Sequence, residues 1–296
     1  MITAKVIADS ISRSNARVTT FVCTYPRFVH SEVMTHRVLS RNASSSRAIP
    51  IDKMIQAVEE NPAMPVFWGK NQSGMQAKEE LDNVRKYCLI GYEDEPPKTQ
   101  REHAIDAWLT ARSIAVAQAR RLQSLGVHKQ LVNRVIEPWS HITVVMTGTD
   151  WANFFALRVH PDAQPEFEEL AAQMLQAFVD SEPVERKCGE WHLPFISDEE
   201  RTIYHENMLL KLCTARCARV SYLNHEGQND PQKDAVLHDK LRESGHMSPF
   251  EHACQAMGMP EQVGNFHGWY QYRKQLPREC IMAIDAEALL AARKKS

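Results

Sequence analysis

Two short runs of β-branched and aromatic residues constrain the fold most, because they interrupt a chain whose other patterns are mainly helical. Residues 17–25, RVTTFVCTY, and residues 140–149, SHITVVMTGT, are typical of strands. Between them, residues 51–133 consist mostly of good helix formers, with a break at DEPPK, residues 94–98. So few strands among so many helices favour an α+β fold, in which a small antiparallel sheet packs with many helices.

Residue spacing predicts several further elements along the chain. They are a helix over 27–39, a polar loop over 40–50, helices over 75–92 and 103–126, a third strand within 246–260 and a helix over 265–276. The aromatic residues of this last helix are expected to pack in the core rather than to stack on a ligand ring: Trp269, Tyr270 and Tyr272. No low-complexity linker divides the chain, so we expect one domain over residues 1–296, with a helical insertion at about 51–126.

Composition narrows the class of protein. The chain has 296 residues, 43% of them hydrophobic, and a formal net charge of -2. A near-neutral chain gives no reason to expect binding along a nucleic-acid backbone, which needs a basic surface. No apolar stretch approaches the roughly 20 residues that cross a bilayer. The first residues, MITAKVIADSISR, lack the apolar core of a signal peptide. We therefore expect a cytoplasmic protein that binds neither nucleic acid nor membrane.

The cysteines and histidines do not suggest a disulfide framework or a metal site. Seven cysteines, an odd number, are widely spaced. Cys213 and Cys217 lie four residues apart but have no second pair at metal-ligand spacing, so we expect buried thiols. Near His246, the adjacent residues Glu251 and His252 point to opposite faces of a strand, which argues against a shared metal ion.

The polar segment from His36 to Arg47 carries the most chemistry. It reads His-Arg-x-x-Ser-x-Asn-x-x-Ser-x-Arg. The hydroxyls of residues 44–46, nearby backbone amides and the Arg47 guanidinium form a set of donors suited to a phosphate. Asn42 is placed to bond to the loop backbone. The residue chemistry alone leaves a second interpretation open, a serine-rich surface loop with solvated arginines.

This segment resembles the nucleotide- and flavin-binding motif of flavin-dependent thymidylate synthases. The matching residues are His36, Arg37, Ser40, Asn42, Ser45 and Arg47. The preceding PRFVHSEVMTHR resembles the motif helix of that family, with Glu32 at a glutamine position. The resemblance implies that His36 and Arg37 contact FAD. It also implies that Ser45 and Arg47, with Ser46 beside them, hold the 5′-phosphate of a deoxynucleotide.

Two further family segments occur at the far end of the chain. CARVSY at 217–222 and ESGHMSPFEHACQAM at 243–257 resemble segments that come before the motif in the family. The chain therefore resembles a circularly permuted, divergent member, which close chain termini make feasible. By this resemblance Ser221, His246 and Ser248 line the flavin site. The alternative for the second segment is a strand start with a buried Phe250.

The middle of the chain supplies a third match. NRVIEP at 133–138 and NFFALR at 153–158 resemble family segments that hold the nucleotide and the flavin. The resemblance implies that Arg134 and Arg158 bind the nucleotide, with Arg158 acting at the pyrimidine ring as the catalytic residue. Asn153 would contact the flavin. The alternative for Arg158 is a surface arginine that the helix macrodipole favours at a helix C-terminus.

Together these matches imply a FAD-dependent methyltransferase of the thymidylate synthase type. It would reductively methylate C5 of a deoxypyrimidine monophosphate, dUMP to dTMP, with methylene-tetrahydrofolate and NADPH as co-substrates. No metal and no cysteine nucleophile is required. By analogy with the family we expect a homo-oligomer, a tetramer.

Three positions depart from the family pattern. Thr35 replaces an arginine, Ala43 a glutamate and Glu32 a glutamine. An ionised glutamate only accepts hydrogen bonds and so suits the amine of cytosine. Alternatively, Glu32 faces solvent or pairs with an arginine. Two other functions therefore stay open: the same scaffold acting on dCMP or making a hydroxymethylated nucleotide, and a non-catalytic nucleotide-binding relative.

Overall fold

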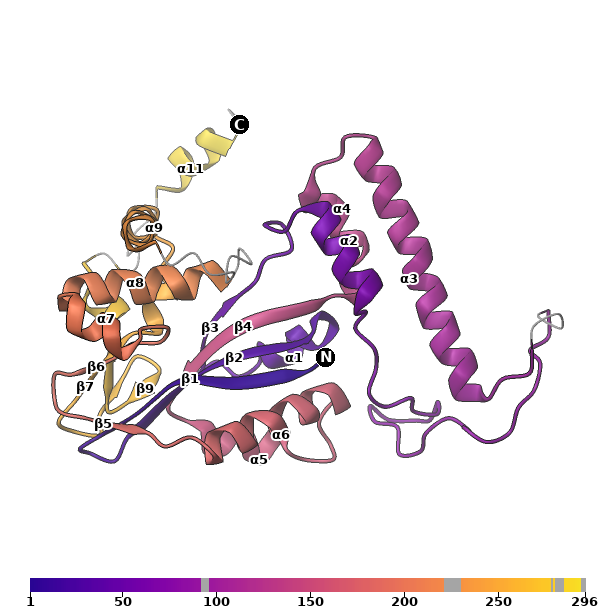
Figure 1. Ribbon diagram of the computed structural model, residues 1–296, viewed down its shortest axis with the longest axis horizontal. Helices are drawn as coiled ribbons and strands as arrows, with labels where there is room; N and C mark the ends of the chain where they lie inside the picture. The colour runs from indigo at the N-terminus through magenta and orange to yellow at the C-terminus, as the bar shows by residue number, and fades with distance from the viewer. Residues whose placement is uncertain (92–95, 221–229, 278, 280–284, 294–296) are drawn as a thin grey trace.

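The computed structural model describes residues 1–91, 96–220, 230–277, 279 and 285–293. Its main sheet has five strands in the order β3-β4-β2-β1-β5 (Figure 1). All neighbouring strands pair antiparallel except β5, which runs parallel to β1. The strands are β1 (Thr3–Ser12), β2 (Arg17–Pro26), β3 (Ser40–Ala43), β4 (His141–Gly148) and β5 (Val184–Arg186). This arrangement confirms the predicted α+β class and the two predicted strands, whereas β1 and β3 were not predicted.

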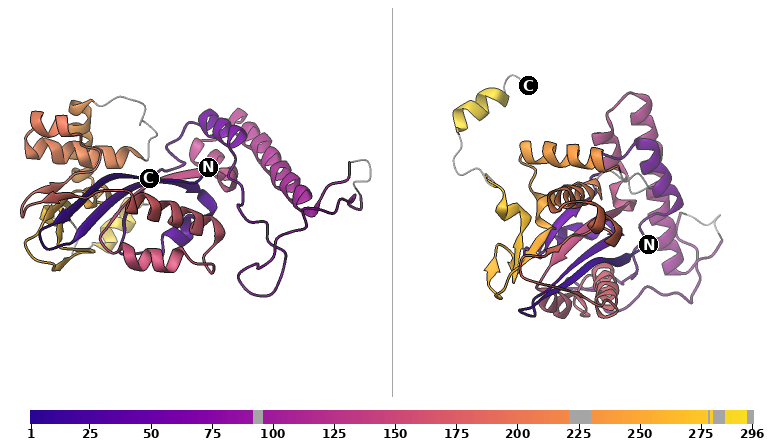
Figure 2. Two further views of the ribbon diagram at one scale, coloured as in Figure 1. Left: turned by 60° about the horizontal axis from the view of Figure 1, so that its bottom comes forward. Right: turned by 60° about the vertical axis from the view of Figure 1, so that its left-hand side comes forward.

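The main core lies between this sheet and helices α5 (Trp151–Arg158) and α6 (Pro165–Val179). Phe21 of β2, Phe154 of α5 and Phe167 of α6 are at most 1% exposed. The Phe154 and Phe167 rings lie 5.9 Å apart. Figure 2 shows α5 and α6 on one side of the sheet and the helices of the C-terminal part on the other. The residues of α5 are thereby held against the strands that carry the motif.

The C-terminal part forms a second layer around smaller sheets. Its three-stranded sheet has the order β10-β7-β6, and β8 pairs with β9. The strands are β6 (Trp191–His192), β7 (Cys254–Ala256), β8 (Gln262–Val263), β9 (Phe266–His267) and β10 (Trp269–Gln271). The helices are α7 (Asp198–Ile203), α8 (Glu206–Arg219), α9 (Pro231–Glu243), η4 (Ser248–Glu251), α10 (Tyr272–Gln275) and α11 (Ala286–Arg293).

Helices α2 (Ile51–Glu60), α3 (Gln100–Ser124) and α4 (Lys129–Val135) form a cluster at one end of the sheet (Figure 1). They share a small core that includes Val58, Val116 and Val132. Thr99 and Glu102 form a capping box that starts α3. The predicted helix over 103–126 is confirmed by α3. Helix α4 and the short 3-10 helix η2 (Glu137–Trp139) follow it in the chain.

One predicted helix is shorter than expected, and one predicted loop begins with a strand. The segment 27–39 contains only η1 (Arg27–Val29) and α1 (His30–Val33). The helix ends early because side chains take its last carbonyls: the Thr35 hydroxyl donates to the Glu32 carbonyl at 2.6 Å, and Arg41 Nη1 donates to the Val33 carbonyl at 2.8 Å. Of the predicted loop 40–50, the first four residues form β3, because they pair with β4.

Two more predicted helices are wrong in most of their length. Residues 75–91 contain no helix, and the pairings near them are the isolated bridges Gly69↔Glu80 and Tyr87↔Lys98. These residues are almost all exposed, so helix propensity had no apolar face to bury. In 265–276 strands β9 and β10 replace the helix until Tyr272. Trp269 and Tyr272 are buried in the core, as expected, and Tyr270 is half-buried.

The cysteine prediction is confirmed for Cys213 and Cys217, which are buried free thiols. Among the described residues, no group of three or more His, Cys, Asp or Glu side chains is arranged to hold a metal ion. Within that same part of the chain, no helix is long and apolar enough to cross a membrane.

A buried chain of hydrogen bonds joins the main sheet to the C-terminal part. Ser10 Oγ lies 2.9 Å from His192 Nδ1, and His192 Nε2 lies 2.8 Å from Thr20 Oγ1. Thr20 Oγ1 lies 2.8 Å from Thr147 Oγ1, which lies 2.8 Å from His252 Nδ1. Burial lowers the pKa of His252 to about 3, and burial together with nearby arginine charges lowers the pKa of His192 to about 3. Both imidazoles are therefore neutral in the folded protein at neutral pH.

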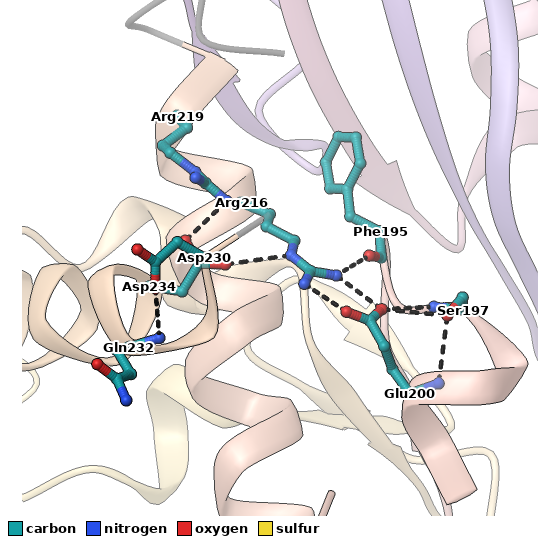
Figure 3. Close-up of polar contacts among 8 residues, drawn as sticks. All are labelled: Phe195, Ser197, Glu200, Arg216, Arg219, Asp230, Gln232 and Asp234. Atoms are coloured by element: carbon teal, nitrogen blue, oxygen red, sulfur yellow. Dashed lines mark hydrogen bonds and ion pairs between the residues drawn. The ribbon is translucent and has the colours of Figure 1, made fainter. Parts of the chain in front are cut away.

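A second polar network, built on ion pairs, ties α7, α8 and α9 together (Figure 3). Arg216 of α8 pairs with Glu200 of α7 and with Asp234 of α9, the latter at 3.3 Å. Arg219 reaches the other oxygen of Asp234 at 2.7 Å. Arg216 Nη1 also donates to the carbonyl of Phe195 at 2.7 Å, which stabilises the left-handed backbone of that residue, φ 61°.

We predict that acid destabilises the protein through the two buried histidines. Both titrate near 6.5 in the unfolded chain, so between pH 6.5 and 3 the unfolded state binds more protons and stability falls as pH falls. The expected loss is about 1.4 kcal/mol per pH unit for each histidine. His252→Asn keeps an acceptor for Thr147 and should reduce the slope of unfolding free energy against pH, measured with urea. The exposed His205→Asn is the control, and an unchanged slope in His252→Asn would contradict the prediction.

We also predict that Asp234→Ala lowers the free energy of unfolding by about 3 kcal/mol, because the buried guanidinium of Arg216 loses one of its two carboxylate partners and keeps Glu200. Urea unfolding measures the effect. The control is Glu185→Ala, which removes an exposed pair with Arg13 at 3.7 Å and should have almost no effect. Equal effects of the two substitutions would refute the argument from burial.

Candidate functional site

The predicted phosphate loop begins where β3 leaves its pairing with β4. Ser44 extends the ladder: its amide donates to the Thr143 carbonyl at 2.8 Å, and its hydroxyl accepts from the Thr143 amide at 3.1 Å. Asn133 then holds the loop from α4, because its Nδ2 donates to the carbonyls of Ser46 at 2.7 Å and Ile49 at 3.0 Å. The loop therefore has a defined backbone rather than the freedom of a surface segment.

Within this loop Ser45 and Arg47 present polar groups without a partner. In the described part of the chain, neither the Ser45 hydroxyl nor the Arg47 guanidinium has a side-chain hydrogen bond or ion pair. Ser45 is half-buried and Arg47 is exposed. A hydroxyl beside a guanidinium is a suitable donor pair for an incoming phosphate oxygen.

Ser46 and Arg134 also lie at this loop, and Glu137 joins them. The Ser46 hydroxyl donates to Glu137 Oε1, and Arg134 Nη1 lies 3.1 Å from Glu137 Oε2. Two residues predicted to bind the nucleotide, Ser46 and Arg134, thus share Glu137 although they lie far apart in the sequence. Ser46 is buried and its hydroxyl is engaged, whereas Arg134 is 59% exposed in its side chain and keeps free N–H groups.

Arg158 lies at the other end of β3, where the last residue of α5 meets the segment 35–36. Its Nε donates to His36 Nε2 at 2.7 Å, and its Nη2 donates to Thr35 Oγ1 at 3.2 Å. Its guanidinium carbon lies 4.8 Å from the centre of the Phe167 ring. The guanidinium is thus held by two hydrogen bonds on one edge and by a ring on one face, with its remaining N–H groups available to a ligand.

His36 is almost buried, and its surroundings keep it neutral. Its ring packs edge-on against Phe154 at 4.9 Å between centroids. Burial, together with the charges of Arg158 and Arg41, lowers the pKa of His36 to about 4. A neutral imidazole that accepts at Nε2 must carry its proton on Nδ1. His36 therefore meets Arg158 as a hydrogen-bond acceptor rather than as a second cation.

The other residues predicted at the flavin or the base lie on the surface near this point. Arg37 and Asn153 are exposed, and neither side chain has a hydrogen bond or ion pair among the described residues. Glu32 is half-buried and accepts only from Ser31 Oγ, at 3.0 Å. It pairs with no arginine in the described chain, so the alternative in which Glu32 forms an ion pair with an arginine is not observed there.

The C-terminal residues predicted at the flavin reach the motif through Asn42. Its Nδ2 donates to the Cys217 carbonyl at 2.7 Å, and its Oδ1 accepts from Ser248 Oγ at 3.0 Å. His246 is exposed and its Nδ1 lies 2.8 Å from Ser244 Oγ. Phe250 is fully buried, as the alternative interpretation of this segment predicts, while Ser248 contacts Asn42 of the motif. Ser221 lies outside the described residues.

Four residues of the site were not predicted as functional: Thr35, Asn42, Asn133 and Glu137. Thr35 was noted only as a departure, and Asn42 as a motif match expected to bond to loop backbone, without a binding role. Asn133 and Glu137 stand on either side of matched Arg134 in NRVIEP. A buried amide or carboxylate beside a matched arginine was the available signal, but burial is decided by the fold.

Comparison with known proteins identifies a family. A family model described as thymidylate synthase complementing protein matches residues 15–184, more than half of the chain. No curated protein matches the chain. Two crystal structures of the UMP/dUMP methylase PolB from Streptomyces cacaoi show a distant likeness. That bound with 5-Br dUMP is 18% identical, covers 60% of this chain and 90% of PolB, and has a TM-score of 0.41. That bound with 5-Br UMP is 18% identical, covers 60% and 89%, and has a TM-score of 0.40. These values are too low to carry an argument about this chain.

The family match includes the motif, Arg134 and Arg158, and ends before the segments at 217–222 and 243–257. The permuted order of those segments therefore stays a prediction. The contacts of Asn42 with Cys217 and Ser248 are what a permuted arrangement requires, because they place the far end of the chain against the motif.

We predict that Arg158→Gln raises the pKa of His36 from about 4 toward its ordinary value, because one of the charges that oppose protonation is removed while burial remains. Histidine NMR titration measures the change. Arg120→Gln, which removes an exposed arginine paired with Glu59, is the control. A His36 pKa that is the same in both variants would mean that Arg158 does not act on this imidazole.

Proposed function

We propose that this chain, which belongs to the thymidylate synthase complementing protein family, is an enzyme. It adds a one-carbon unit to C5 of a deoxypyrimidine monophosphate. In the specific form of the proposal, it converts dUMP to dTMP by FAD-dependent reductive methylation, with methylene-tetrahydrofolate and NADPH as co-substrates. We further propose that it acts as a homo-oligomer.

The observation that carries the proposal is the pair of donor groups at the two ends of β3. Ser45 and Arg47 present unpartnered donors at one end, and Arg158 presents the free part of its guanidinium at the other. Arg158 contacts the residues that precede β3, and Ser45 and Arg47 follow β3, so this four-residue strand lies between the two donor groups. In the proposal the phosphate engages one group and the base the other.

Each group has a separate chemical role in this proposal. Arg47 and Ser45 hold the phosphate, and Arg134 adds a further cation beside them. Arg158 donates to a carbonyl of the pyrimidine and stabilises the electron-rich, enolate-like form of the ring, in which C5 can attack the one-carbon unit. Because Arg158 is already held in place, little reorganisation is needed when the ring is bound.

The donor set near Arg158 fits a flavin dinucleotide. Arg37 is an exposed cation without a partner, suited to an anionic cofactor, and Asn153 is an exposed amide with free donor and acceptor groups. His36, Arg37, Asn153, His246 and Ser248 are the described residues that would hold FAD. When bound, the flavin carries the hydride of NADPH to the one-carbon unit, whose conversion from methylene to methyl needs two electrons.

A second candidate function is favoured by Glu32. Its carboxylate lies at a position that is half-buried and free of arginine, where it can accept from the exocyclic amine of cytosine. In that case the substrate is dCMP. The product distinguishes methylation from hydroxymethylation, because a hydroxymethyl group forms from the methylene unit and water without consuming NADPH.

We predict that the purified protein binds FAD, shown by flavin absorbance after reconstitution, and converts dUMP to dTMP with methylene-tetrahydrofolate and NADPH. Mass spectrometry of the nucleotide identifies the product. Arg47→Ala should raise the nucleotide KM about tenfold or more and change kcat little, because a phosphate contact is made equally before and during the reaction.

The control for Arg47→Ala is the exposed Arg120→Ala. Parallel reactions with dCMP decide the base, and NADPH consumption decides between a methyl and a hydroxymethyl product. A protein that cannot be reconstituted with FAD and converts neither nucleotide would leave only the non-catalytic nucleotide-binding relative.

A further inference from the structure

Thr35 stands where the family motif has an arginine, and its surroundings give it a specific task. Its hydroxyl proton is committed: Oγ1 donates to the Glu32 carbonyl at 2.6 Å. A hydroxyl has a single proton and two lone pairs, so the oxygen is left as an acceptor. That acceptor lies 3.2 Å from Arg158 Nη2.

The Thr35 contact complements the one made by His36. His36 Nε2 accepts from Arg158 Nε at 2.7 Å, so two adjacent residues receive donors from two different nitrogens of one guanidinium. A single hydrogen bond leaves the group free to rotate about that contact, whereas two bonds on one edge fix its plane. The Phe167 ring then limits movement on one face. Five N–H groups belong to a guanidinium, and the three that remain point away from this edge.

An arginine at position 35 would act in the opposite direction. It would place a second cation next to Arg158 and would supply no acceptor. Threonine at position 35, unlike arginine, therefore supplies a neutral acceptor to Arg158 in this chain.

We propose that Thr35 is a positioning residue that, together with His36, orients the Arg158 guanidinium toward the pyrimidine ring. The proposal rests on the proposed function of Arg158 at the base. Its effect appears in the transition state, because a donor that is aimed at developing charge contributes most when that charge forms.

The test compares Thr35→Val, Thr35→Ser and Thr202→Val. Valine keeps the shape of threonine and removes the hydroxyl, and serine keeps the hydroxyl. Thr202 is a matched control: its Oγ1 donates to the Glu199 carbonyl at 2.7 Å, the same bond to the third residue before it, at an exposed position without an arginine partner. The protein is used in full length with FAD, and all variants are checked by thermal unfolding.

For Thr35→Val we expect kcat with dUMP or dCMP, whichever is the substrate, to fall about tenfold with a nucleotide KM within about twofold, which is the loss of one charge-assisted bond. Thr35→Ser should restore most of kcat, and Thr202→Val should equal the wild type. The arginine Nε–H resonance in NMR, assigned to Arg158 by its loss in Arg158→Lys, should be sharp in the wild type and broadened in Thr35→Val.

An unchanged kcat together with an unchanged Arg158 resonance in Thr35→Val would overturn the proposal. So would an equal loss in Thr35→Val and Thr35→Ser, since the hydroxyl would then be irrelevant. A wild type that converts neither nucleotide would refute the proposed function instead. In that event the NMR comparison alone decides whether Thr35 orients Arg158.

Discussion

The pairing of β4 with β2 on one side and β3 on the other is the constraint on which the site depends. Thr147 lies opposite Thr20 in one ladder and Ser40 in the other. Because β4 follows β3 by about a hundred residues in the chain, this pairing brings two distant segments into register. The residues just before β3 then meet the end of α5, and those just after it meet α4 and η2. Without β4 the motif would be an isolated polar stretch.

Two arginines of the site, Arg158 and Arg134, have a neutral or acidic neighbour. Arg158 rests on the neutral imidazole of His36 and the hydroxyl of Thr35. Arg134 pairs with Glu137, which also accepts from Ser46. Neutral acceptors leave the charge of Arg158 uncompensated and available to a ligand. The carboxylate of Glu137 instead balances Arg134, so a phosphate that uses Arg134 must share it with that carboxylate.

The C-terminal part is attached to the motif by polar contacts as well as by packing. Asn42 bonds to Cys217 and Ser248, and the buried chain through Thr147 ends at His252. Buried polar groups are costly unless they are satisfied, so such contacts specify one docking arrangement rather than simply adding stability. Cys217 and Ser248 therefore contact the motif although they lie far from it in sequence.

Local chemistry decided part of this protein without the tertiary structure. The strands at 17–25 and 140–149 and the helix within 103–126 follow from β-propensity and helix propensity, and the polar residue types of the motif were readable directly. Helix propensity gave a wrong prediction at 75–91, where no apolar face could be buried. Strand β3 was not predictable, because a four-residue polar strand exists only through its pairing with β4. The partners of Thr35 and Glu137 were likewise decided by the fold. A hydrogen bond between groups more than eighty residues apart depends on strand register and burial, and no local pattern records either of them.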